Sequence, residues 1–194
     1  PLEQFDMKFC IMTCSTLCMA FLACLPETGN LHTEARDVSK NPPSVRVGLV
    51  LSHFGLGDQS FNDMQYNGLV EAYLKHTISA AFRVPRSSSR SDINKAFSEL
   101  INDEQCNTII AGEAWLMKDS LLEFTSRYAN VDFVVFDYHF ADRPNLVTAL
   151  FAQEDGSYAA GYLAARFSSS GRIGFIGGVD VPIVKEFEAG FQRG

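Results

Sequence analysis

Short apolar runs alternate with amphipathic stretches along most of the chain. The stretches between the runs carry apolar residues at helical spacing, as Met64, Leu69 and Tyr73 do in the first of them. The predicted strands are 45–52, 78–84, 107–112, 131–137, 146–151 and 171–178, and the predicted helices are 60–76, 91–103, 116–129, 156–169 and 182–194. This alternation predicts an α/β fold in which a mostly parallel sheet is covered by helices on both faces.

Polar residues and one proline mark the starts of the predicted helices. Ser91 or Asp92 can cap the helix over 91–103, because short oxygen-bearing side chains accept from the free N–H groups of the first turn. Pro182 stands at the first position of the last helix, where a missing N–H removes no hydrogen bond.

The same pattern divides the body of the chain into two parts. Five predicted strands fall within 45–151, which forms an N-terminal α/β lobe. Residues 152–194 add one strand between two helices and start a second lobe of the same kind. Because one strand cannot bury both of its faces, we expect this second lobe to be incomplete and to need further chain.

The first 44 residues follow a different pattern. From Met7, which we interpret as the initiator, one Lys is followed by an apolar stretch that ends in small Ala23 before Cys24, as in a secretory signal. The ending FLAC resembles a lipoprotein box, in which Cys24 becomes lipidated; a plain cleaved signal and an uncleaved anchor remain open. We therefore expect 1–24 to be a signal or lipoprotein segment, and polar, proline-containing 25–44 to be a tether. The protein is then exported and held at the plasma membrane by its lipid.

Composition removes several classes of function. The net charge is -7 and basic residues do not cluster, which argues against nucleic-acid binding. Four of the five cysteines lie in the first 24 residues, so the body offers neither a zinc site nor a disulfide framework, and Cys106 is interpreted as a small buried hydrophobe. The four histidines have no matched nucleophile, and GFIGGVDVP lacks the spacing of a dinucleotide loop. No metal, no cofactor and no enzyme activity are expected.

The segment GLGDQSFND, residues 55–63, follows the first strand of the lobe. In parallel sheets covered by helices, ligands bind at the carboxyl ends of the strands, where this segment lies. Asp58 or Ser60 can cap the following helix, which accounts for the polar residues. That role does not account for Phe61, which can stack on a planar ligand, or for Asn62, which offers both a donor and an acceptor.

Other residues follow later strands in the same way, each with a plain structural alternative. Trp115 is a ligand contact or a packing residue, and Asp119 a ligand contact or a helix cap. Asp137 either faces the ligand or binds neighbouring backbone N–H groups. Gly177 and Gly178 allow the backbone to approach a ligand or a hinge closely.

Three separated motifs together resemble one known family. They are GLGDQSFND at 55–63, AQEDGSYAAGYLAA at 152–165 and GRIGFIGGVDVPIVKEFEAGFQRG at 171–194. In this order they look like the basic membrane protein family of ABC-transporter substrate-binding lipoproteins, which includes purine nucleoside receptors. The resemblance covers 45–194 and implies the type I periplasmic-binding-protein fold, with a chain longer than this one.

The resemblance also implies roles for particular residues. Phe61 takes the position of the aromatic that stacks on the purine base, Phe187 that of the aromatic on the other face of the base, and Asp119 that of an acceptor for base N–H groups. Two positions depart from the pattern, because Ser52 stands where nucleoside receptors often carry Asp, and Ala114 replaces a glycine. The expected ligand-binding set is Asp58, Ser60, Phe61, Asn62, Trp115, Asp119, Asp137, Gly178 and Phe187.

The resulting functional hypothesis is a lipid-anchored protein that captures a nucleoside between two lobes and delivers it to an ABC permease. The loss of the carboxylate at Ser52 leaves a sugar or another small solute as an alternative ligand. A second alternative is an exported surface antigen or adhesin that uses the same fold.

Overall fold

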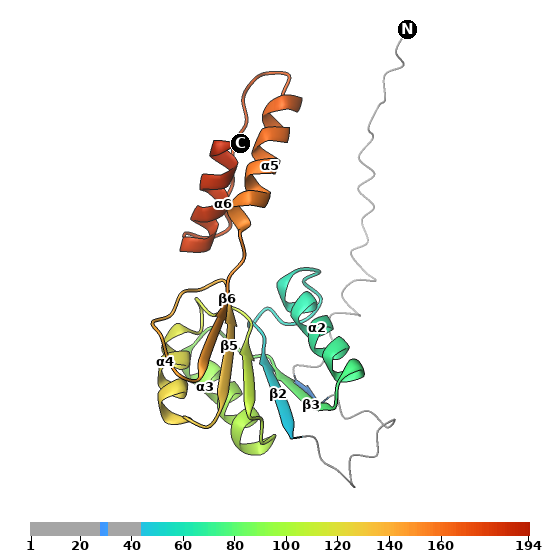
Figure 1. The fold of residues 1–194 in the computed structure, drawn as a ribbon, viewed down its shortest axis with the longest axis vertical. Helices are drawn as coiled ribbons and strands as arrows, with labels where there is room; N and C mark the ends of the chain where they lie inside the picture. The colour runs from blue at the N-terminus through green and yellow to red at the C-terminus, as the bar shows by residue number, and fades with distance from the viewer. Residues whose placement is uncertain (1–27, 31–43) are drawn as a thin grey trace.

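The computed structural model describes residues 28–30 and 44–194, and its centre is a six-stranded sheet (Figure 1). The strands follow the order β1-β3-β2-β4-β5-β6, and all neighbours pair in parallel except β1 and β3. Their bounds are β1 Thr28–Asn30, β2 Val45–Val50, β3 Ile78–Arg83, β4 Thr108–Ala111, β5 Asp132–Phe136 and β6 Leu146–Ala149. The prediction of an α/β fold with a mostly parallel sheet is confirmed.

Strand β1 was not among the strands predicted from the sequence. Within 25–44, which was predicted to be a tether, Thr28–Asn30 pairs antiparallel with Ala81–Arg83 at the edge of the sheet. An edge strand presents unpaired backbone N–H and C=O groups that any nearby extended segment can bind, with no apolar pattern required. The predicted signal segment 1–24, with Cys24, and the remainder of the tether lie outside the described residues.

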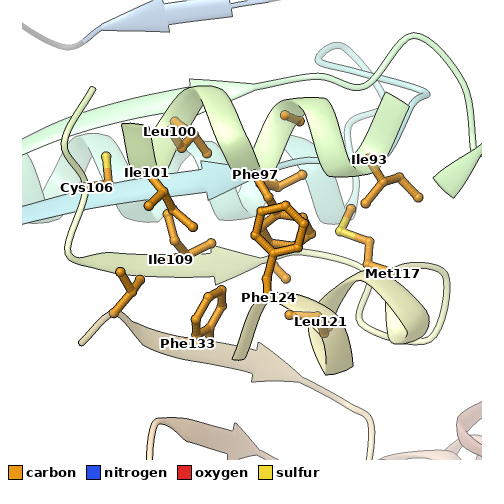
Figure 2. Packing of buried hydrophobic residues seen from close by; sticks show 14 of the residues in the cluster. Ile93, Phe97, Leu100, Ile101, Cys106, Ile109, Met117, Leu121, Phe124 and Phe133 are labelled. Carbon is orange, nitrogen blue, oxygen red and sulfur yellow. The ribbon is translucent and has the colours of Figure 1, made fainter. Parts of the chain in front are cut away.

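The larger core lies between the sheet and the helices α3 (Arg90–Ser98) and α4 (Lys118–Arg127). Helix α3 continues as the π-helical turn η2 (Glu99–Asp103). Figure 2 shows Phe97 and Phe124 side by side above Phe133 of β5. The ring centroid of Phe97 lies 5.2 Å from that of Phe124 and 6.3 Å from that of Phe133, and all three side chains are fully buried.

The opposite face of the sheet is covered by α2 (Phe61–Lys75). Leu69 and Tyr73 of this helix pack on Leu49, Leu51 and Phe82 of the sheet. Residues that alternate along β2 therefore enter different cores, because successive side chains of a strand point to opposite faces. Helices on both faces were predicted, and this placement confirms them.

Strand β3 is joined to the end of α3 by an ion pair that is mostly shielded from water. Arg83 Nε donates to Glu99 Oε2 at 2.9 Å, and its Nη2 donates to Glu104 Oε1 at 2.6 Å. The arginine side chain is only 11% exposed. One guanidinium thus satisfies two carboxylates on the π-helical turn and the residue after it.

The N-cap of α3 differs from the prediction. The helix begins at Arg90, and the hydroxyl of Ser89 accepts a hydrogen bond from the N–H of Asp92 at 3.2 Å. Ser91 and Asp92, the predicted caps, are already inside the first turn. Three consecutive serines precede the helix, and the cap belongs to the one that lies three residues before a free N–H.

Helices α5 (Gln153–Phe167) and α6 (Pro182–Arg193) pack on each other beyond the end of β6 (Figure 1). Glycines allow their backbones to touch: a Cβ on Gly161 would lie 2.1 Å from the carbonyl oxygen of Phe191, and one on Gly190 would lie 2.3 Å from that of Glu154. The segment 171–178, predicted as a strand, has no regular structure. A strand needs a neighbour to pair its backbone groups, and 171–178 pairs with none of the described strands.

Candidate functional site

The carboxyl ends of the central strands form one edge of the sheet, next to the start of α2. The ladders continue one residue beyond the strands: Leu51 N–H donates to Arg83 O, Gly112 N–H to Val50 O, and Asp137 N–H to Ala149 O, at 2.9–3.0 Å. The loops after β2, β4 and β5 therefore start at the same level. Most of the candidate residues from the sequence lie on these loops or on the helices that follow them.

Asp58 organises the start of α2. Its Oδ1 accepts from the N–H groups of Ser60 and Asp63, and its Oδ2 accepts from the N–H and the side-chain amide of Asn62, at 2.9–3.1 Å. Partial burial raises the pKa of the Asp58 carboxyl, but these four hydrogen bonds outweigh it and hold the pKa below its ordinary value. Of the two caps considered from the sequence, Asp58 is the one used; the Ser60 side chain makes no capping bond.

A second carboxylate closes the loop before the helix. Asp63 accepts from the N–H of Gly57 at 2.7 Å and from the N–H of Gln59 at 2.8 Å. Gly57 has a φ of 95°, a backbone conformation that side chains with a Cβ rarely adopt. Between them, the two aspartates use backbone N–H groups from both sides of the turn, so the loop that precedes Phe61 is held in one shape.

Asn62 lies differently from the expectation that it faces a ligand. Its side chain is 2% exposed, and its Nδ2 donates to Ser52 Oγ at 2.9 Å and to Asp58 Oδ2 at 3.1 Å. Its Oδ1 accepts from the N–H of Ser52 at 2.9 Å. Both amide hydrogens are therefore used inside the protein, and Asn62 fixes α2 to the end of β2.

Phe61 is the aromatic side chain that this network presents to solvent. It is the first residue of α2 and is 53% exposed. Sequence reasoning missed a neighbouring aromatic, Phe54, which is 74% exposed and whose ring lies 4.1 Å from the imidazole of His53. The position of Phe54, seven residues before Phe61 in the same loop, is the signal that could have identified it.

Glu113, at the end of β4, was also missed. Its side chain is half-buried, and burial raises the pKa of its carboxyl. A hydrogen bond from Ser52 and the charge of His53 oppose this rise, whereas Asp58 adds to it. A glutamate immediately after a strand of the sheet was visible in the sequence as EAW, but only its tertiary neighbours distinguish it from a surface residue.

Two further polar groups at this edge are buried without a partner among the described residues. They are Nδ1 of His53 and Oε1 of Gln65. The other end of the Gln65 amide donates to the carbonyl of Gly112 at 3.1 Å, so α2 is tied to β4 as well as to β2. The edge thus combines an exposed aromatic with several polar groups whose hydrogen-bonding capacity is not fully used.

Asp137 directly follows β5 and has a strained backbone conformation, with a φ of 56°. Its Oδ1 is buried and has no partner within the described part of the chain. Burial raises the pKa of the Asp137 carboxyl, and the negative charge of Glu186 on α6 adds to the rise. Asp137 lines a cavity of about 340 Å³ between the end of the sheet and the two last helices. The lining also includes Tyr138, Phe151, Gln153, Glu154 and Glu186.

The remaining expected residues are not gathered at one point. Trp115 is half-buried in the turn after β4, and Asp119 is exposed in the first turn of α4. Gly178 is exposed in the irregular segment before α6, and Phe187 lies on α6, where it is 38% exposed. The sheet edge therefore brings together Asp58, Ser60, Phe61 and Asn62, while Phe187 and Gly178 belong to the part that follows β6.

The described residues contain no group of three or more histidine, cysteine, aspartate or glutamate side chains placed to hold a metal ion. Within the same residues, none of the helices has the length and apolarity that crossing a bilayer requires.

The family model for PnrA-like ABC transporter substrate-binding proteins, Bmp, matches residues 45–194. The chain belongs to this family. The Bmp match covers the whole described sheet except β1, together with α5 and α6. Members of the Bmp family are substrate-binding proteins rather than enzymes, as the sequence predicted.

Three curated relatives of this Bmp chain are 24–27% identical to it. The ABC transporter nucleoside-binding protein BmpA of Lactococcus lactis is 24% identical over 97% of this chain and 53% of its own length. The CD4+ T-cell-stimulating antigen of Listeria monocytogenes is 27% identical over 80% of this chain and 44% of its own length. Basic membrane protein A1 of Borrelia garinii is 27% identical over 91% of this chain and 49% of its own length. The chain spans about half the length of the curated relatives it matches.

A solved structure supports the fold of the Bmp chain. An ABC transporter solute-binding protein from Aeropyrum pernix K1 superposes with a TM-score of 0.65 at 22% identity, over 76% of this chain and 41% of that one. At this identity the likeness concerns the fold alone. It agrees with the type I periplasmic-binding-protein fold that the resemblance implied.

Proposed function

We propose that this protein is a lipid-anchored receptor that captures a purine nucleoside and delivers it to an ABC permease. The observation that carries the proposal is the position of Phe61: an aromatic side chain, 53% exposed, stands at the carboxyl edge of the sheet on the first residue of α2. Membership of the Bmp family supports a role in ABC transport. The name of the Lactococcus relative, a nucleoside-binding protein, supports a nucleoside as the ligand.

Stacking gives Phe61 its function in this proposal. The Asp58 network holds the backbone of the helix start from which the ring projects, so little backbone freedom remains to be lost when a flat ligand binds. An aromatic ring stacked on a base contributes about 1–3 kcal/mol. Phe187, on α6 in the part that follows the sheet, is proposed to cover the other face of the base when the two parts close on it.

Polar groups would then set the orientation of the base and sugar. Asp119 is proposed to accept hydrogen bonds from the ligand, and Trp115, Asp137 and Gly178 to line the same space. Asn62 and Asp58 act indirectly, since their polar atoms hold the loop and helix that carry Phe61.

Binding measurements on the complete protein, expressed from its whole gene, test the proposal. Titration calorimetry with guanosine, inosine, uridine and ribose is expected to give purine nucleosides as the tightest ligands. Phe61→Ala should weaken them about 5- to 150-fold, the loss of one stacked face. Phe167→Ala, which truncates an 83% exposed aromatic at the end of α5, should change nothing.

Two results would contradict the proposal. Binding of ribose alone, or nucleoside binding that Phe61→Ala leaves unchanged, would favour a sugar or another small solute. Absence of any small-molecule binding, together with adhesion to host matrix, would favour the surface-antigen alternative.

The lipid anchor is proposed from the signal-like stretch that ends at Cys24. Cells grown with labelled palmitate should incorporate the label into the wild-type protein and into Cys18→Ser. The Cys18→Ser variant is the matched control, because it makes the same substitution at another cysteine of the same stretch. Cys24→Ser should remain unlabelled and leave the membrane fraction. Equal labelling of both variants would exclude Cys24 as the lipidated residue.

A further inference from the structure

Helix α5 is joined to α6 by a serine hydroxyl whose acceptor is Phe187. Ser157 Oγ donates to the backbone carbonyl oxygen of Phe187 at 2.5 Å, and Ser157 is only 7% exposed. Serine and threonine hydroxyls inside a helix commonly donate to a carbonyl three or four residues earlier in the same helix. Thr125 of α4 does so, with the carbonyl of Leu121 as its acceptor at 2.7 Å. The hydroxyl of Ser157 instead links two helices, at the residue that carries the second aromatic ring.

The other contacts between α5 and α6 set how close the helices lie rather than how they are rotated. At Gly161 and Gly190 the two backbones touch, and such contacts depend on shape alone. A bond from Gln153 Nε2 to Glu186 Oε2, at 3.1 Å, lies at the surface, where water competes with it. A hydrogen bond also requires its donor to point at its acceptor, so the buried bond from Ser157 opposes rotation of α6 about its own axis.

The side of α6 that carries Phe187 faces the end of the sheet. Ile183 and Glu186 line the cavity of about 340 Å³ that is also lined by Asp137, the residue after β5. Phe187 lies one turn after Ile183, and residues four apart share one side of a helix. Its side chain is 38% exposed. A rotation of α6 would therefore turn the Phe187 ring away from the sheet edge.

We propose that Ser157 is a positioning residue for ligand binding: its hydroxyl holds α6 in the rotation at which the Phe187 ring covers the ligand. This inference rests on the proposed nucleoside binding and adds the residue that fixes the second aromatic. Ser157 acts through Phe187, because its hydroxyl hydrogen is used by the Phe187 carbonyl. A ring that is held in place before binding loses less freedom when the ligand binds, so the hydroxyl raises the affinity.

A double-mutant cycle on the complete protein, measured by titration calorimetry with guanosine, tests this inference. Ser157→Ala removes the hydroxyl and leaves the glycine contacts in place. It should weaken guanosine binding about fivefold, the effect of one neutral hydrogen bond. In the Phe187→Ala background the same change should have no effect, because the ring on which it acts is gone. In the Phe61→Ala background the fivefold loss should remain, since Phe61 lies on a different helix.

The control variant is Ser91→Ala, which makes the same substitution at an exposed position of α3. It should leave guanosine binding unchanged in every background. The melting temperature of Ser157→Ala should fall by no more than about 4 °C, the shift expected for one hydrogen bond. A merely structural role of Ser157 would lower the affinity whichever residue stands at position 187, so the dependence on Phe187 separates positioning from general packing.

Each outcome has a defined meaning. If guanosine binding depends on Phe61 and Phe187 but Ser157→Ala leaves it unchanged, the inference is wrong and the proposed function stands. An equal loss in the wild-type and Phe187→Ala backgrounds, or loss of cooperative unfolding in Ser157→Ala, would also overturn it, because Ser157 would then act without Phe187. If Phe187→Ala itself leaves binding unchanged, the inference fails together with the role proposed for Phe187. If the wild-type protein binds no nucleoside, the inference and the proposed function are both wrong.

Discussion

Replacement of Asp58 should weaken both the fold and the presentation of Phe61. The carboxylate receives three backbone N–H groups and one side-chain amide at the start of α2. Because this region is exposed, water replaces part of what is lost, and the relevant scale is that of a helix cap rather than the sum of four hydrogen bonds. Asp58→Ala should therefore lower the free energy of unfolding by about 1–2 kcal/mol.

Asp58→Asn provides a graded comparison. An asparagine keeps one side-chain oxygen for the N–H groups and loses the charge, so its effect should be about half that of alanine. Asp142→Ala is the control, since Asp142 is exposed and has no hydrogen-bond partner among the described residues. Urea unfolding at pH 7, followed by circular dichroism, measures all three variants of the complete protein.

The stabilisation by the Asp58 carboxylate should depend on pH. The pKa of Asp58 in the folded protein is below its ordinary value of 3.8, so the carboxylate's contribution is fully present above that pH and is lost as the pH falls through the folded pKa. The destabilisation by Asp58→Ala should be the same at pH 5 and 7 and smaller at pH 3. A loss below about 0.3 kcal/mol at pH 7, or an equal loss at pH 3, would refute the capping argument.

Three further substitutions test the packing. Phe97→Ala removes a fully buried ring from the larger core and should lower the free energy of unfolding by about 3–5 kcal/mol in urea denaturation, against no change for exposed Phe167→Ala. Arg83→Met leaves Glu104 without an ion-pair partner and Glu99 with Lys95 alone, at 3.7 Å, and should destabilise the protein by about 2 kcal/mol, between the values for exposed and buried ion pairs. Gly161→Ala forces a Cβ to within 2.1 Å of a carbonyl of α6 and should lower the melting temperature, whereas Gly156→Ala, in open space on the same helix, should be neutral or raise it.

These substitutions can also fail in informative ways. A neutral Phe97→Ala would mean that the core between α3, α4 and the sheet is not packed as described. A neutral Arg83→Met would mean that the two glutamates are as well solvated without the arginine. Equal effects at Gly156 and Gly161 would contradict the close contact of α5 with α6.

The period of the apolar pattern was sufficient to predict the sheet lobe. The runs at 45–52 and 107–112 are rich in Val, Ile and Leu. Strands buried on both faces have this composition whatever their position in the sheet. The segment after the first strand could be assigned to a helix start because Asp58 lies within capping distance of the following N–H groups along the chain. Local spacing carries such information, so both the elements and the position of Phe61 followed from the sequence.

Features that depend on a partner from elsewhere in the chain could not be predicted in this way. Thr28–Asn30 is a strand because it pairs with the edge of β3, whereas 171–178, with a better strand pattern, pairs with none of the described strands and stays irregular. Asn62 is drawn into the protein by Ser52, ten residues earlier, and Glu113 gains its buried surroundings from Ser52 and His53. The sequence determined the helices and strands of the sheet lobe from β2 to β6, since their apolar spacing depends on neighbours along the chain. Only the tertiary structure decided which polar groups are satisfied, since hydrogen bonds and burial depend on neighbours in space.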